Sequence, residues 1–321
     1  MKTSLGFRVG QFFIAACVAA VLCYGSVAGA QDEPPQANEP QSGAPQTGTP
    51  QSSVPKAGEA QGPEMAADPA PPMLEAGFRL LYELNFKAAR EKFFAYQKIR
   101  PDDSLGKAAE AASYLFEEFN EKGVLTSEFF LNDDRFLGGI EGKPAENRNN
   151  AFLDANHKAH DMAKKAVKAN SHDTQGLLVL AMTDGLESNY AAMIEKKQLP
   201  ALSLMRQAES ESNALLAIDP KAMDGYVALG MSNYVIGCLP SYKRAFLWFG
   251  GVHGDRNRGI QQMKTAAEGG HYLQPFAKIL LALAYEREHQ AHLAQPLLAD
   301  LSAQYPSNPI FAHELALIAK K

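Results

Sequence analysis

Residues 73–102 read MLEAGFRLLYELNFKAAREKFFAYQKIRPD, and this stretch decides the fold. Apolar residues recur in it every three to four positions, which is typical of amphipathic helices. The pattern predicts two short helices, back to back, closed by Pro101. Helices pack at about 8–10 Å only when small side chains lie at the contact. Gly77 falls at the position where the two helices of such a hairpin must approach each other.

This hairpin resembles the tetratricopeptide repeat (TPR), a unit of about 34 residues with small residues at the helix crossing and a terminal proline. The positions that carry the resemblance are Gly77, Leu80, Ala89, Phe93 and Pro101. Tyr96 departs from the pattern, which has a small residue there. A lone hairpin cannot bury its apolar face, so the resemblance implies that several units stack into an array.

Partial copies of the same pattern recur in order along the chain, at residues 159–171, 208–230 and 281–306. In the first of these, Ser171 stands in the place of the proline. No strand pattern of any length is present in the sequence. We therefore expect an all-α fold: a right-handed, TPR-like α-solenoid of four to five helix-turn-helix pairs with a C-terminal capping helix, from Met73 to Lys321.

The first 30 residues have the pattern of an export signal, with Lys2 and Arg8 at the start, an apolar stretch, and Ala28-Gly29-Ala30 as the cleavage site. Two alternatives remain open. Residues 14–17 (IAAC) fit a lipoprotein signal, although the apolar stretch continues beyond Cys17. An uncleaved segment could also anchor the chain in a membrane. The sequence thus predicts an exported protein of the periplasm or cell envelope.

Residues 31–72 form a Pro/Gln-rich linker that holds ten of the 19 prolines. Proline recurs every five residues from Pro35 to Pro55, which prevents both helix and sheet. With few large apolar residues, the segment has no core to form. We expect a disordered, extended tether that spans at most about 130 Å.

Composition narrows the classes of partner. Removal of the signal would take away two positive charges, so the formal net charge would change from −5 to −7. A negative chain disfavours nucleic acid and anionic membranes as general partners. Cys238 would be the remaining cysteine, which excludes an internal disulfide. A buried hydrophobe near a helix end is the expected role of Cys238, and a reactive thiol is the alternative.

The middle of the chain contains a second motif, Leu239-Pro240 followed by Gly254-Asp255-Arg256 and Gly259. Its order is similar to a pattern in exported bacterial TPR proteins and in the eukaryotic inclusion-body-clearance TPR family. The resemblance implies the fold and no transferable activity. The motif overlaps the ends of an aromatic insertion, residues 238–254, which either fills a break in the repeat or contacts a partner.

Candidate chemistry is weak, and we predict no enzyme activity and no cofactor. Histidines three residues apart, with Asp154 or Glu286 nearby, form an imperfect match to a di-iron helix motif; these pairs are His157 with His160 and His289 with His292. Polar helix faces are the simpler explanation. A phosphate loop needs a preceding strand and a Lys-Ser or Lys-Thr pair, and the sequence around Gly250, Gly251 and Gly254 has neither.

The sequence therefore favours a non-catalytic extracytoplasmic adaptor that binds a protein or peptide in the groove of the array. A membrane contact would come only from the N-terminal segment. The residues expected to contact the partner are Tyr226, Asn233, Tyr234, Tyr242, Phe246 and Trp248. Two alternatives stay open: a ligand-binding or transport accessory protein of the periplasm, and a metal-binding helical protein.

Overall fold

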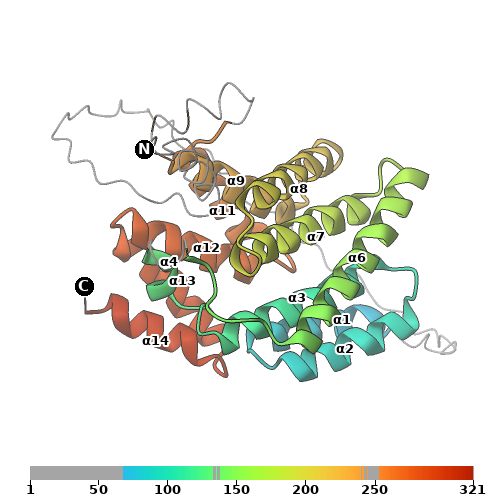
Figure 1. Ribbon diagram of the computed structural model, residues 1–321, viewed down its shortest axis with the longest axis horizontal. Helices are drawn as coiled ribbons and strands as arrows, with labels where there is room; N and C mark the ends of the chain where they lie inside the picture. The colour runs from blue at the N-terminus through green and yellow to red at the C-terminus, as the bar shows by residue number, and fades with distance from the viewer. Residues whose placement is uncertain are drawn as a thin grey trace, which may run out of the picture. The chain divides into compact units, whose positions relative to one another are not determined.

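The computed structural model describes residues 68–132, 135, 138–239, 241, 244 and 253–320. The predicted signal, most of the predicted linker, and the side chains of Tyr242, Phe246 and Trp248 lie outside the described residues. Within them every regular element is a helix (Figure 1). No described helix is both long enough and apolar enough to cross a membrane.

The helices pack in adjacent antiparallel pairs, as the repeat pattern predicts. The pairs are α1 (Ala70–Tyr82) with α2 (Phe86–Ile99), α3 (Ser104–Glu121) with α6 (Glu146–Ala169), α7 (Thr174–Met193) with α8 (Gln198–Ile218), α9 (Tyr226–Gly237) with α11 (Arg256–Gly269), and α12 (Gln274–Arg287) with α13 (Ala291–Gln304). The last helix, α14 (Pro309–Ile318), packs on α13 and caps the array. Two short elements complete the list: α4 (Ser127–Leu131) and the 3-10 turn η1 (Met223–Gly225).

Side chains at the N-caps fix where many of the helices begin. The free backbone N–H groups of a first turn need acceptors, and Asp or Asn before the turn supplies one. Residues that do this here are Asn85, Asp103, Asp173, Asp255 and Asn308. The helix α1 starts at Ala70, three residues before the expected boundary at Met73. Pro71 and Pro72 fit there because first-turn N–H groups have no intrahelical acceptor.

The close approach predicted at Gly77 is confirmed. A Cβ atom at this position would lie 2.3 Å from Cε1 of Phe93, a ring that is fully buried. The aromatic ring of α2 therefore fills the space that the missing side chain of α1 leaves. The same device recurs in the pair formed by α9 and α11, where Gly230 of α9 meets Met263 of α11.

The first and last pairs of the array contact each other. The ring of Phe78 in α1 stacks on Tyr272, at a centroid distance of 4.8 Å. The hydroxyl of Tyr82 donates to the carbonyl of Tyr272 over 2.9 Å, and Asn308 Nδ2 donates to the carbonyl of Tyr82 over 2.8 Å. Phe116 of α3 packs edge-on against Phe276 of α12. Contacts between residues 160 to 226 positions apart thus join the beginning of the array to its end.

Candidate functional site

Two of the predicted contact residues, Asn233 and Tyr234 of α9, are buried. Asn233 Nδ2 donates to Gln262 Oε1 of α11 over 3.0 Å. The Tyr234 hydroxyl donates to Glu288 Oε1 over 3.2 Å, just beyond α12. Burial and the negative charge near it raise the pKa of Tyr234 well above its ordinary value. These side chains join α9 to its neighbours, so they do not form a surface for a partner in this structure.

Of the other predicted contact residues, Tyr226 is described by the structure and three are not. Tyr226, at the start of α9, is partly buried and packs against the core cluster around Met263. Tyr242, Phe246 and Trp248 lie outside the described residues, and their role as contacts stays a prediction. The side chains of α9 from Leu229 to Gly237 are buried with the exception of Met231, so most of this helix lies in the core.

The glycines of the second motif have packing roles. A Cβ at Gly259 would lie 2.5 Å from the backbone nitrogen of Tyr234, and one at Gly254 would lie 2.4 Å from Cβ of Ile236. Asp255 caps α11 by accepting from the backbone N–H of Arg258 over 2.9 Å. Arg256 pairs with Glu288 over 3.3 Å. Together these contacts hold the beginning of α11 against the end of α9, from which the aromatic insertion departs.

Cys238 is buried at the end of α9, as expected for a small hydrophobe near a helix end. Burial raises the pKa of its thiol to about 11. Since the thiolate is the nucleophile, a thiol with this pKa is poorly reactive at neutral pH. The structure therefore favours the packing role over the reactive one.

The histidine pairs do not assemble a metal site among the described residues. The helix α12 ends at Arg287, and His289 follows with a positive φ of 58°. Glu286 and His289 therefore do not share one helix face, which the di-iron motif requires. On α6, His160 Nε2 lies 3.6 Å from Asp184 of α7.

Asp184 belongs to a pair of carboxyl groups between α7 and α8. Its side chain is buried, and the Glu211 carboxyl group of α8 lies close to it. Burial, followed by the charge of Asp184, raises the pKa of Glu211 to about 8. The pKa of Asp184 is also raised by burial, against the opposing effect of His160. Burial between the helices thus favours the protonated form of both carboxyl groups.

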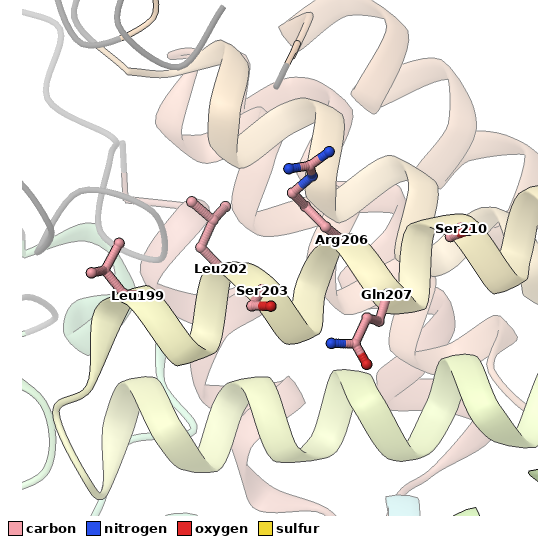
Figure 2. Close-up of a pocket in the computed structure, with 6 residues that line it drawn as sticks. All are labelled: Leu199, Leu202, Ser203, Arg206, Gln207 and Ser210. Atoms are coloured by element: carbon pink, nitrogen blue, oxygen red, sulfur yellow. The ribbon is translucent and has the colours of Figure 1, made fainter. Parts of the chain in front are cut away.

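One face of α8 borders an open depression of about 410 Å³ (Figure 2). The side chains that line it are Leu199, Leu202, Ser203, Arg206, Gln207 and Ser210. Positions three or four apart lie on one side of a helix, so Leu199, Ser203 and Arg206 follow a single ridge. Leu199 is 55% exposed, the largest exposure among the large apolar side chains that the structure describes.

Sequence reasoning missed this α8 face. The signal was present, because Leu199 stands beside Pro200 in a polar stretch with no apolar partner three or four residues before it. It was weak because single exposed leucines are common on protein surfaces.

Comparison with known proteins adds little to this geometry. No family model matches the chain. No curated protein matches it in sequence. The crystal structure of a thermophilic TPR protein from Thermus thermophilus is similar to it, with 15% sequence identity and a TM-score of 0.42 over 78% of this chain and 100% of that chain. A likeness of this extent carries no weight for function, and the all-α paired-helix fold rests on the packing described above.

Proposed function

We propose that this chain is a non-catalytic, TPR-like scaffold, exported to the periplasm or cell envelope, that binds another protein. The face of α8 is the observation that supports this proposal. An exposed leucine and a guanidinium flank a serine on one ridge. The short side chain of Ser203 lets a partner helix approach, while Arg206 is of a residue type enriched at protein interfaces.

The location is proposed from the sequence of the first 72 residues. A cleaved signal would release the array into the periplasm, whereas a lipidated or retained N-terminus would leave it on a tether of about 130 Å at most. In the tethered case the scaffold would hold its partner at a distance from the membrane. Fractionation of cells into membrane and soluble envelope fractions, with the mature N-terminus sequenced, distinguishes these cases.

The test of the scaffold function is capture of a partner after crosslinking in cells. Leu199→Glu places a charge on the α8 ridge, and Leu293→Glu is its matched control, since Leu293 of α13 is also an exposed leucine (39%). We expect the wild type and Leu293→Glu to capture the same partner protein. Leu199→Glu should no longer capture it.

A third variant tests the aromatic insertion. Deletion of residues 241–252 removes Tyr242, Phe246 and Trp248 while leaving α9 and α11 in the chain. Loss of capture with this deletion alone would place the contact on the insertion. Capture of no specific protein by the folded wild type would refute the scaffold and favour a small ligand instead. Circular dichroism of each variant confirms its folding.

A further inference from the structure

The connection between α3 and α6 is far longer than its two helices need. Paired helices are usually joined by about 2–8 residues. Residues 83–85 suffice between α1 and α2, and residues 288–290 between α12 and α13. Between α3 and α6 the chain uses residues 122–145. Long connections of this kind are usually functional, and here the extra length carries α4 to the C-terminal helices.

The short helix α4 is held at both ends by side chains of distant helices. Glu314 of α14 accepts from the backbone N–H of Ser127 over 3.0 Å, and its other oxygen accepts from the Ser127 hydroxyl. Arg287, at the end of α12, donates to the carbonyl of Phe130 over 2.9 Å. Ser127 and Glu314 are each only about 5% exposed. Figure 1 shows α4, in green, beside α12 and away from α3 and α6, its neighbours in sequence.

The charges at this position match the polarity of a helix. A helical turn is partly positive at its N-terminus and partly negative at its C-terminus. The Glu314 carboxylate faces the first end of α4 and the Arg287 guanidinium faces the second. An acidic group at the N-terminal end and a basic group at the C-terminal end would also suit one turn of helix from a separate peptide. Here the bound turn belongs to the chain itself.

The contacts also define what each position of the bound turn must supply. Position 127 must donate from both its backbone and a hydroxyl. Position 128 can hold any residue, because the Glu128 side chain is 79% exposed. Phe129 is buried in the core cluster that α1, α3, α6 and α7 share. The Phe130 ring is partly buried against this cluster and lies edge-on to Phe129 at 5.4 Å. A phosphate on the hydroxyl would be repelled by Glu314.

We propose that Arg287 of α12 and Glu314 of α14, together with the core cluster that holds Phe129, form a peptide-binding site, which the chain fills with its own residues 127–130 and which accepts a matching segment of a partner protein. That segment is one helical turn with Ser or Thr, any residue, and then two aromatic residues. The inference rests on the proposed scaffold function and names the chemistry of a partner. Because α4 is tethered, it competes at high effective concentration, and an added peptide binds weakly until α4 is displaced.

The test uses a fluorescent peptide of residues 124–132, VLTSEFFLN, and fluorescence anisotropy with the full chain. The double variant Ser127→Ala/Phe129→Ala weakens the internal segment and leaves Glu314 and Arg287 in place. We expect it to bind the peptide at least tenfold more tightly than the wild type does. Adding Glu314→Gln should reduce this binding at least tenfold, and replacing the serine of the peptide by alanine should have a similar effect.

Two results would overturn the inference: a folded double variant that fails to bind the peptide, or binding that Glu314→Gln leaves unchanged. If the double variant does not fold, the single variant Ser127→Ala serves as the test, because it removes one hydroxyl hydrogen bond and keeps the buried Phe129 ring. We then expect Ser127→Ala to bind the peptide more tightly than the wild type does. Equal or absent binding overturns the inference. If partner capture depends on Leu199 but the peptide does not bind, the peptide site is refuted and the scaffold function stands. If the peptide binds but partner capture does not depend on Leu199, only the α8 surface is refuted.

Discussion

Replacing Gly259 by alanine tests whether the second motif serves to bring α9 and α11 together. The added Cβ would lie 2.5 Å from the backbone nitrogen of Tyr234 and 2.8 Å from the carbonyl oxygen of Gly230. Backbone atoms cannot rotate aside, so the helices must separate. Overpacking costs about 1–3 kcal/mol, and rigid backbone neighbours place this case at about 3. The higher helix propensity of alanine returns about 1 kcal/mol. We expect a net loss of about 2 kcal/mol in the free energy of unfolding.

The control for Gly259→Ala is Gly185→Ala in α7. Gly185 is also inside a helix, but a Cβ there would meet no atom within 4 Å. It should gain about 0.5–1 kcal/mol from helix propensity alone. Urea unfolding followed by circular dichroism at about 222 nm measures both variants. If Gly259→Ala proved as stable as Gly185→Ala, the close approach would be absent and the packing role of the motif would be refuted.

Three further predictions follow from buried groups. Phe93→Ala should cost about 3–5 kcal/mol, because the fully buried ring fills the space beside Gly77, and thermal unfolding measures it. Asp224→Ala should lower stability by about 3 kcal/mol in the same assay, since its carboxylate accepts the backbone N–H groups of residues 271, 272 and 273 over 2.7, 3.0 and 3.2 Å. The pKa of Glu211 is about 8 in the folded chain and about 4.3 when unfolded, so its contribution to stability is present at low pH and lost as pH rises through about 8. Urea unfolding at pH values of about 6 and 9 should show a smaller fall for Glu211→Gln than for the wild type, and an equal fall would contradict the assignment.

Local patterns in the sequence predicted the paired helices well because those patterns have local causes. Asp173 and Asp255 cap the helices that follow them, and the glycine at 77 allows the crossing that its position implies. A cap acts within one turn, and a crossing within one hairpin. Both can therefore be read from a window of about 30 residues.

Contacts between distant parts of the chain could not be predicted in the same way. Nothing near Ser127 indicates that its hydroxyl will meet Glu314, 187 residues later. Asn233 and Tyr234 were expected to contact a partner, and they are buried because α7, α8 and α11 pack against α9. Burial of this kind depends on how whole helix pairs stack. The sequence of a single helix does not predict it.

The topology places the unusual features of this chain at one edge of the array. In each pair, the first helix ends and the second begins at the same edge. The long connection after α3 leaves from this edge, and Ile140 within it donates to the carbonyl of Met193 at the end of α7. Leu199 lies at the start of α8, Arg287 at the end of α12, and the aromatic insertion departs from the end of α9. Residues can be added at an edge without disturbing the stacking of pairs, so the edge is where an array of this kind can acquire binding surfaces.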